Sequence, residues 1–279
     1  MKILGIIPAR YGSTRFPGKP LADILGKPMI WWVYNQAKKA KKLTDLIVAT
    51  DDERIMRACD QFDIPNIMTN IHENGISRVH EVSQKIKADL YVQINGDEPL
   101  IESRIIERII PRVIGRDFVA NLICKIKSPN ELLDLSNIKI IFDKNKKAIY
   151  MSRTPIPTPY KSLEFEYYKH IGVLAYTKSM LDFFALSKPS KYEKIEGLEI
   201  LRFVEYGKDF YCIEVKNFKS LSVDTPKDLE KIKNNLKNKK NKKKKNYNLI
   251  LKFYIQKKNH PLNFKLSPAI KGTTFSFSF

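Results

Sequence analysis

The sequence predicts an α/β fold: a Rossmann-like, mostly parallel mixed sheet with helices on both faces and a small antiparallel insertion. Strand-like and helix-like segments alternate over residues 2–113, whereas strand-like segments follow one another directly over residues 118–151. Regular alternation is typical of a doubly wound parallel sheet, and consecutive strands joined by turns are typical of antiparallel pairing. A chain of 279 residues with 43% apolar content is long enough to bury one such core.

The first half of the chain supplies the parallel part of this sheet. Its expected strands are short apolar runs, as in strands buried on both faces, and its expected helices carry apolar residues at helical spacing. Pro28 stands where a proline favours the first turn of a helix. The strands are expected at 2–8, 46–50, 64–69 and 89–94, and the helices at 28–41, 53–62, 76–86 and 103–113.

The second half contains the antiparallel insertion and the end of the domain. A proline-rich loop at 152–160 separates the insertion from the segments that complete the sheet. We expect one catalytic domain over residues 1–235 and a poorly ordered tail over 236–279. The expected strands are 118–126, 138–142, 148–151, 170–176 and 210–214, and the expected helices are 178–186, 195–206 and 225–234.

The net charge of +20 belongs mainly to the tail. Fourteen of the 50 basic residues lie in 231–271 and no acidic residue follows Glu230, so residues 1–230 carry 36 basic and 30 acidic residues, a net charge of +6. A lysine- and asparagine-rich segment repels itself and cannot build a core. We interpret it as a solvated extension, with weak attraction to polyanions or membrane surfaces as the alternative. No specific nucleic-acid partner is expected.

The cysteines and the apolar runs point to a cytoplasmic protein. Cys59, Cys124 and Cys212 are widely spaced and form no CxxC pair, which is typical of buried thiols in a reducing compartment. The apolar stretch at the N-terminus is too short for a signal peptide, and no apolar run has the length of a membrane span.

The loop after the first expected strand carries the strongest chemical signal. Gly12 and Gly18 allow backbone amides to approach an anion, and Arg10, Arg15 and Lys19 add positive charge within ten residues. Each residue alone is more often part of a solvated turn. Together, at the carboxyl end of a buried strand, they predict a site for a nucleoside triphosphate. The spacing is neither that of a Walker loop nor that of GxGxxG.

Two carboxylates are candidates for binding Mg²⁺. Asp97 lies in an Asn-Gly-Asp-Glu-Pro turn at the end of the expected strand 89–94, and Asp224 precedes the helix expected at 225–234. Mg²⁺ prefers one or two carboxylates together with substrate phosphates. A plain turn at Asp97 and a helix cap at Asp224 are the alternatives for each residue taken singly.

These motifs stand together in an order that resembles one enzyme family. The blocks are IPARYGSTRFPGKPL at 7–21, IVATD at 47–51, GDEP at 96–99, NIK at 137–139, Ser-Arg at 152–153, KHIG at 169–172, LEILR at 198–202 and VDTPKDL at 223–229. From residue 3 to about residue 232 the chain resembles the 3-deoxy-manno-octulosonate (Kdo) cytidylyltransferases, the CMP-Kdo synthetases of lipopolysaccharide and capsule assembly.

The resemblance implies a reaction, a cofactor and a set of site residues. CMP would pass from CTP to the anomeric hydroxyl of Kdo, giving CMP-Kdo and pyrophosphate, with Mg²⁺ as cofactor in a homodimer. Arg10, Lys19 and Asp97 would be catalytic, and Asp97 and Asp224 would hold the metal. The implied CTP-binding residues are Ala9, Arg10, Ser13, Arg15, Lys19, Gly75, Arg78 and Asn95, and those around the sugar acid are Arg153, His170, Tyr176 and Glu199.

Three departures from the family pattern bear on specificity. Residues 74–78 read Asn-Gly-Ile-Ser-Arg where the family usually has Ser-Gly-Thr-Asp/Glu-Arg, Asn95 replaces a Gln, and Ile200 replaces another Gln. The first change bears on recognition of the base. The other two bear on the sugar, because loss of a polar contact favours a substrate that lacks the partner group. The 8-amino analogue of Kdo is therefore an alternative substrate. For His170 we expect a hydrogen bond to a sugar hydroxyl or carboxylate, because no second residue at ligand spacing suggests a metal.

Two further functions remain as alternatives. A cytidylyltransferase for a sialic-acid relative would share the first loop in weaker form, and the Gly-Asp-Glu-Pro turn disfavours it. A non-catalytic relative that only binds a nucleotide sugar is disfavoured because Arg10, Lys19, Asp97 and Asp224 occur together.

Overall fold

The computed structural model describes residues 1–12, 16–162, 165–216, 218 and 221–238. The chain divides into two compact units, Met1–Lys233 and Asn234–Phe279. Residues 226–238 are helical, where the sequence predicts a helix over 225–234. The rest of the expected tail, from residue 239 on, lies outside the described residues.

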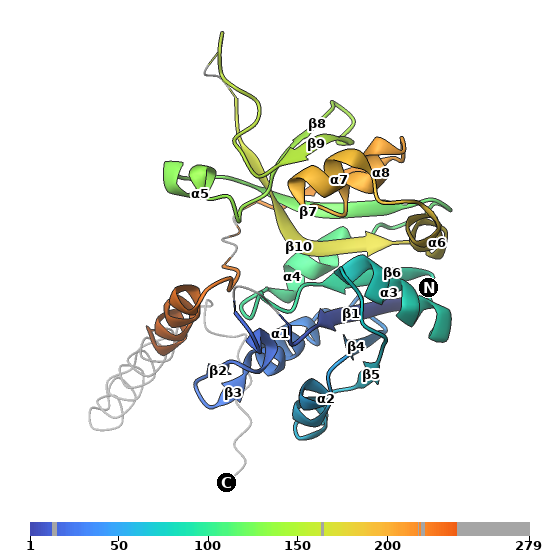
Figure 1. The fold of residues 1–279 in the computed structure, drawn as a ribbon, viewed down its shortest axis with the longest axis vertical. Coiled ribbons are helices and arrows are strands. Elements are labelled where there is room, and N and C mark those ends of the chain that lie inside the picture. The colour runs from blue at the N-terminus through green and yellow to red at the C-terminus, as the bar shows by residue number, and fades with distance from the viewer. Residues whose placement is uncertain (13–15, 163–164, 217, 219–220, 239–279) are drawn as a thin grey trace, which may run out of the picture. The chain divides into compact units, whose positions relative to one another are not determined.

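A single large sheet organises the first unit (Figure 1). Within the described residues it has nine strands, and its main path runs β11-β7-β10-β6-β1-β4-β5, with β8 and β9 attached beside β10. The strands are β1 (Ile3–Ala9), β4 (Asp45–Thr50), β5 (Asn66–Met68), β6 (Leu90–Ile94), β7 (Val119–Lys125), β8 (Lys139–Phe142), β9 (Ala148–Ser152), β10 (Tyr168–Tyr176) and β11 (Phe210–Glu214).

The strand directions confirm the mostly parallel mixed sheet. Strand β1 pairs in parallel with β4 and with β6, and β7 pairs in parallel with β11. Strand β10 is antiparallel to both of its neighbours, β6 and β7. The carboxyl ends of β1, β4 and β6 therefore meet at one edge, which is where open α/β sheets bind ligands.

Helices cover both faces of this sheet. On one face, the apolar sides of α3 (Gly75–Lys85), α6 (Lys178–Leu186) and α8 (Leu201–Glu205) share a core with Leu4 and Ile6 of β1. Side chains of a strand alternate between faces, so Ile3 and Ile7 point to the other side. There β1 contacts α1 (Met29–Ala37), which also packs against α4 (Ser103–Ile106). The helix α2 (Glu53–Asp60) contacts β4 and β5.

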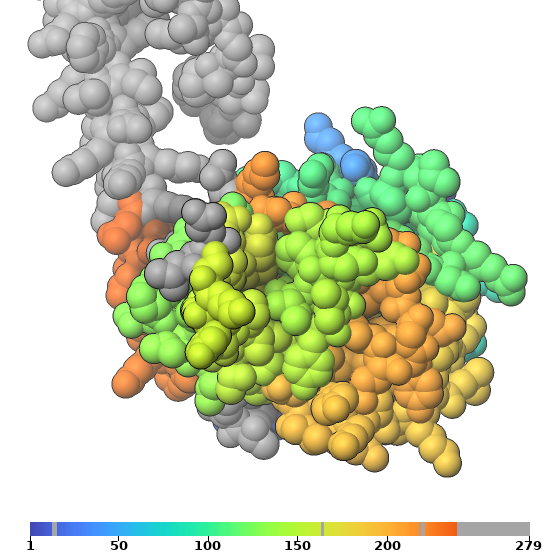
Figure 2. All heavy atoms as spheres, turned by 90° about the horizontal axis from the view of Figure 1, so that it is seen from above, coloured from blue at the N-terminus to red at the C-terminus, as the bar shows by residue number. Residues whose placement is uncertain are grey.

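The expected antiparallel insertion is the hairpin of β8 and β9. These strands pair with each other, and β8 joins the main sheet through β10. Beside the hairpin lie α7 (Lys191–Glu196) and α8, and all of these elements lie on the face seen in Figure 2. A separate two-stranded ribbon, β2 (Asp23–Ile24) with β3 (Lys27–Pro28), and the short helix α5 (Pro129–Leu133) are further elements that the sequence did not predict.

Two expected helices are wrong in extent. The helix predicted over 103–113 is shorter: α4 is followed by a 3₁₀ turn, Glu107–Ile109, and helical structure stops there. Pro111 disfavours helical backbone at the residue before it, Ile110. The helix predicted over 195–206 is two short helices. Gly197 has a left-handed backbone (φ 62°) that ends α7, so α8 begins only at Leu201.

The core contains the three cysteines as free, buried thiols. Burial raises the pKa of Cys59 to about 12, that of Cys124 to about 11 and that of Cys212 to about 12, so these thiols are protonated at neutral pH. Among the helices of the described residues, none is long and apolar enough to cross a membrane.

Candidate active site

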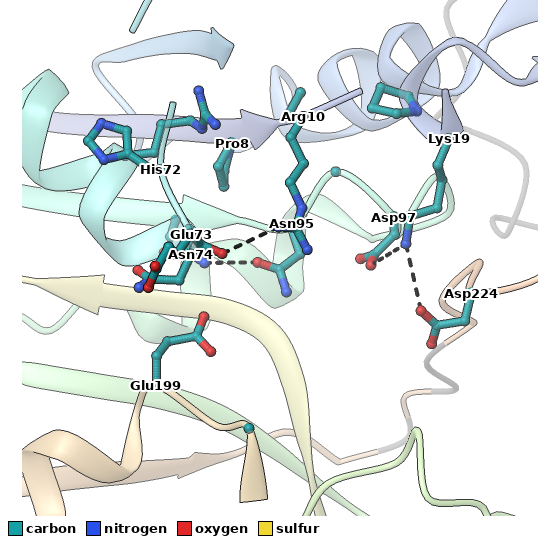
Figure 3. A pocket seen from close by; sticks show the side chains of 17 residues that line it. Pro8, Arg10, Lys19, His72, Glu73, Asn74, Asn95, Asp97, Glu199 and Asp224 are labelled. Carbon is teal, nitrogen blue, oxygen red and sulfur yellow. Dashed lines mark hydrogen bonds and ion pairs between the residues drawn. The ribbon is translucent and has the colours of Figure 1, made fainter. Parts of the chain in front are cut away.

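A cavity of about 410 Å³ lies at the carboxyl ends of β1 and β6 (Figure 3). It brings together nine residues that the sequence predicted to be functional: Ala9, Arg10, Lys19, Gly75, Arg78, Asn95, Asp97, Glu199 and Asp224. The other lining residues were not predicted from the sequence: Pro8, Pro20, His72, Glu73, Asn74, Gln93, Gly96 and Gly197. Most of these side chains and backbone groups are polar, so the cavity suits a charged, hydrogen-bonding ligand.

Lys19 and two carboxylates gather at one end of the cavity (Figure 3). The Lys19 ammonium lies 3.0 Å from Asp97 Oδ2 and 3.6 Å from Asp224 Oδ1, and it donates to the Val223 carbonyl at 3.0 Å. All three side chains are mostly shielded from solvent. Asp97 and Asp224 are 127 positions apart in sequence, so only the fold brings their carboxylates around one cation.

A backbone hydrogen bond between Gly18 and Tyr11 closes the first loop. The Gly18 amide donates to the Tyr11 carbonyl at 2.9 Å, and Gly18 adopts a left-handed backbone (φ 67°) directly before Lys19. A side chain at Gly18 would meet the Tyr11 ring at 3.1 Å, so glycine suits this close turn. The Arg54 guanidinium stacks on the Tyr11 ring, 3.3 Å from its centre. The expected CTP contacts Ser13 and Arg15 lie outside the described residues.

Arg10 is exposed at the mouth of the cavity. Its Nη1 donates to the Glu73 carbonyl at 3.3 Å, and its charge acts on the carboxyl of Glu199. Burial raises the pKa of Glu199 in spite of Arg10 and Arg153 nearby, which lower it. Arg10 and Glu199 come from opposite walls, and each remains accessible to a ligand between them (Figure 3).

The amino end of α3 forms another wall. Asn74 caps this helix through its Oδ1, which accepts from the Ser77 amide at 2.9 Å. Arg78 is nearly buried and pairs with Asp51 at 2.9 Å and with Thr69 Oγ1 at 2.5 Å, so these residues hold α3 to the end of β4. The free amides of a helix N-terminus favour an anion.

A chain of side-chain hydrogen bonds includes two amides that line the cavity, those of Gln93 and Asn95. The Tyr176 hydroxyl donates to Gln93 Oε1 at 3.4 Å, and Gln93 Nε2 donates to Asn95 Oδ1 at 2.9 Å. Because Asn95 Oδ1 accepts from Gln93, the Asn95 amino group is left to donate elsewhere. A side chain at Gly75 would lie 2.9 Å from Gln93 Nε2, so the glycine at the start of α3 makes room for this chain of hydrogen bonds.

Three of the residues expected around a sugar do not line the cavity. Tyr176 is fully buried and reaches it only through Gln93. Arg153 donates to the carbonyls of Glu196, Leu135 and Gly197 at 2.8–3.3 Å and so supports the segment that carries Glu199. His170 Nδ1 lies 2.9 Å from Asn121 Oδ1, and burial lowers the pKa of His170 to about 4, although the charge of Asp97 acts against this.

His72 was missed by the sequence analysis. It lies at the end of the cavity opposite Lys19 (Figure 3), and its Nε2 is 2.7 Å from Glu81 Oε2. Lys85 also pairs with Glu81 at 2.7 Å. Burial alone would raise the pKa of Glu81, but hydrogen bonds from Lys85, His72 and the Asn70 amide outweigh it and hold the pKa at about 2. The only hint of this pair in the sequence was Glu81, an acidic residue nine positions after His72 on the helix that follows it.

The chemistry of these residues fits a magnesium ion that binds together with phosphates. No group of three or more His, Cys, Asp or Glu residues suited to a metal occurs in the described part of the chain. The two carboxylates that converge on Lys19 match the one or two that Mg²⁺ takes from a protein when phosphate oxygens supply other ligands.

Comparison with known proteins identifies the family. The family model described as Cytidylyltransferase matches residues 4–210, which include the first loop, Asp97 and Glu199. The chain belongs to the cytidylyltransferase family. This cytidylyltransferase is 41% identical over 246 residues to the 3-deoxy-manno-octulosonate cytidylyltransferase of Geobacter metallireducens, covering 83% of the chain and 96% of that protein.

Two other comparisons refine the picture. The cytidylyltransferase is also 41% identical, over 243 residues, to the 8-amino-3,8-dideoxy-manno-octulosonate cytidylyltransferase of Shewanella baltica, covering 85% of the chain and 99% of that protein. Among solved structures it is similar to a CMP:2-keto-3-deoxy-manno-octonic acid synthetase complexed with CTP, with a TM-score of 0.78 and 38% identity over 86% of the chain and 100% of that protein. Relatives with two different sugar names are thus equally similar.

Proposed function

We propose that this cytidylyltransferase transfers CMP from CTP to the anomeric hydroxyl of Kdo, giving CMP-Kdo and pyrophosphate. The observation that carries the proposal is the cavity at the carboxyl ends of β1 and β6. One end holds Lys19 between Asp97 and Asp224, and the opposite wall holds Glu199, so a triphosphate and a sugar acid can be placed side by side. The solved relative complexed with CTP supports the same choice of nucleotide.

The reaction is an in-line displacement at the α-phosphorus. The anomeric oxygen of the sugar acid forms a new bond to this phosphorus, the bond to the β-phosphate bridging oxygen breaks, and the hydroxyl proton leaves to solvent. Arg10 and Lys19, which line the cavity, would offset the charge of the pyrophosphate as it departs, together with the amides at the start of α3. The protein contributes mainly by holding the two substrates in this geometry.

Asp97 and Asp224 would hold Mg²⁺ in this proposal. A bound Mg²⁺ supplies positive charge that offsets the charge of the phosphate oxygens. In the structure the Lys19 ammonium lies between the two carboxylates and offsets part of their negative charge. When CTP enters, the same ammonium can turn to a phosphate oxygen and no longer stand between the two carboxylates.

The 8-amino analogue of Kdo is the second candidate substrate. It is favoured by the relatives, which carry the two names at the same identity, and by Asn95 and Ile200. Asn95 lines the cavity, whereas Ile200 is 6% exposed and belongs to the core. We therefore give Asn95, and not Ile200, the greater weight in sugar choice.

We further propose that the protein acts as a homodimer. Within the described residues β9 pairs with β8, and Lys147, just before β9, bridges to Tyr211 of β11, so only the later part of the outer edge of β9 is left to accept another chain. Exposed apolar side chains surround the insertion, among them Ile149 of β9 and Leu133 and Leu135 near α5. Such residues are expected at an interface. Size-exclusion chromatography with light scattering tests the proposed dimer, and the mass of a monomer would contradict it.

A pyrophosphate-release screen tests the proposed substrates. CTP and UTP are each offered with Kdo, its 8-amino analogue and a sialic acid, in the presence of Mg²⁺. We expect release with CTP and an octulosonate, with little from UTP. Release with sialic acid alone would replace the proposed sugar, and CTP binding without release in any mixture would favour the non-catalytic alternative.

A further inference from the structure

Strand β10, which lies between β6 and β7 in the sheet, contains a bulge. Backbone groups in this bulge are bonded by side chains of neighbouring segments. His170 pairs with Ile123 of β7, but Leu174 pairs with Asn121, so three residues of β10, 171–173, are set against one residue of β7, Leu122. The backbone groups between these positions lose their usual ladder partners. Buried groups of this kind must find other partners.

Asn121 supplies two of these partners. It is fully buried on β7, and its Nδ2 donates to the carbonyls of Ile171 at 2.8 Å and Val173 at 3.0 Å. Backbone carbonyl oxygens can only accept, so this contact fixes which end of the Asn121 amide carries the nitrogen. The reversed amide would set an oxygen against two oxygens.

The other two partners come from the loop that carries Asp97. Glu98 Oε1 accepts from the Gly172 amide at 2.9 Å, and the Asn95 amide donates to the Gly172 carbonyl at 2.7 Å. The bulge is thus held from β7 on one side and from the loop after β6 on the other. This loop and the residues of β10 therefore keep a fixed relation to each other.

The orientation of Asn121 determines the state of His170. Both hydrogens of Asn121 Nδ2 are used, so the atom that faces His170 Nδ1, at 2.9 Å, is the acceptor Oδ1. The hydrogen in this bond must come from His170 Nδ1. A neutral imidazole with its proton on Nδ1 has a lone pair on Nε2. Burial keeps His170 neutral at pH 7, since it lowers the pKa to about 4.

His170 Nε2 remains available to a ligand. Across the described residues it forms no hydrogen bond, and it is not among the side-chain atoms sealed from solvent without a partner. His170 stands two residues before Gly172, which is bonded to Asn95 and Glu98 on either side of Asp97, so this part of β10 adjoins the loop that lines the cavity. A lone pair there can accept from a hydroxyl or an ammonium group, but a carboxylate, which has no hydrogen, cannot use it.

We propose that Asn121 is a positioning residue that holds His170 as the Nδ1–H tautomer, so that Nε2 accepts a hydrogen bond from an O–H or N–H donor of the sugar acid. The identity of that ligand rests on the proposed function, whereas the tautomer does not. Of the two contacts expected for His170, hydroxyl or carboxylate, the structure thus favours the hydroxyl.

Nitrogen NMR on the full chain tests the tautomer without any substrate. The histidines are labelled with ¹⁵N, and long-range proton–nitrogen correlations at pH 7.5 show which ring nitrogen carries the proton. The signals of His170 are identified by their loss in His170→Gln. We expect protonated Nδ1 and unprotonated Nε2. Protonated Nε2 would overturn the proposal, and this result needs no Asn121 variant to fold.

Kinetics of Asn121→Ala test the positioning role. We expect KM for the sugar acid to rise about tenfold, the effect of one misplaced hydrogen bond, with KM for CTP nearly unchanged. Asn66→Ala is the matched control, because Asn66 Nδ2 also donates to a carbonyl, that of Ile64 at 3.1 Å, but lies on β5. An unchanged sugar KM in folded Asn121→Ala would overturn the role.

Kdo and its 8-amino analogue identify the donor. An equal rise in KM for both assigns a hydroxyl that they share, and a larger rise for the analogue assigns its ammonium group. A wild-type protein that turned over neither sugar would contradict the proposed function, while its NMR spectrum would still decide the tautomer of His170.

Discussion

Replacing Gly172 with alanine should damage the site from within the sheet. A Cβ at this position would lie 2.8 Å from both Cβ and Nδ2 of Asn95 and 3.0 Å from its Cγ. Apolar atoms normally approach to about 3.5–4.0 Å, so roughly 1 Å of movement is required. Asn95 cannot turn away freely, because Gln93 donates to its side chain at 2.9 Å and its own amide donates to Gly172 at 2.7 Å.

The expected effect of Gly172→Ala has two parts. Overpacking of this kind lowers the free energy of unfolding by about 1–3 kcal/mol, which urea titration measures. A shift of about 1 Å in the loop before Asp97 should lower kcat for pyrophosphate release by about 10²-fold. Gly115→Ala is the control, since a Cβ there meets nothing within 4 Å and should change stability by less than about 0.5 kcal/mol. Wild-type stability and turnover in Gly172→Ala would refute this reasoning.

Three further predictions concern the metal site, the stability in acid and the tail. Asp97→Asn should lower Mg²⁺-dependent pyrophosphate release by about 10²–10³-fold, and turnover like that of the wild type would rule out Asp97 as a metal ligand. The pKa of Glu81 falls from 4.5 to about 2 in the folded state, so its contribution is complete above pH 4.5 and is lost as the pH falls toward 2. With allowance for the 15% exposure of this side chain, Glu81→Gln should unfold more easily at pH 7 by about 1–3 kcal/mol, and urea titrations in which this difference did not shrink in acid would contradict the assignment. Deleting residues 236–279 should leave kcat/KM unchanged if 1–235 is the catalytic domain, whereas lost activity would show that the tail contributes to folding or assembly.

The parts of the site that the sequence predicted are those that follow from strand ends. The polar loops after two buried strands were each predicted to be functional, and Lys19 of the first loop lies 3.0 Å from Asp97 of the second. Gly18 and Gly75 are tightly packed, but against Tyr11 and Gln93, so the expected approach of the first-loop glycines to an anion stays a prediction. The fold class and the family were predicted for the same reason, since alternating elements and loop motifs are local properties of the chain.

The parts that were missed depend on contacts between distant elements. Gln93 sits inside a continuous apolar strand, and only the packing of Tyr176 and Gly75 around it makes it part of the cavity. His72 is placed by Glu81 of the next helix. Tyr176 is buried where β10 pairs with both β6 and β7, so no local pattern could have shown that it reaches the cavity only through Gln93.

The most direct test of the central claim is the ³¹P NMR spectrum of a reaction that contains the full chain, CTP, Kdo and Mg²⁺. The structure and the proposed in-line displacement predict that the three CTP signals give way to pyrophosphate and to one phosphodiester signal from CMP-Kdo. Unchanged CTP, or conversion to CDP and inorganic phosphate with no phosphodiester, would contradict the claim.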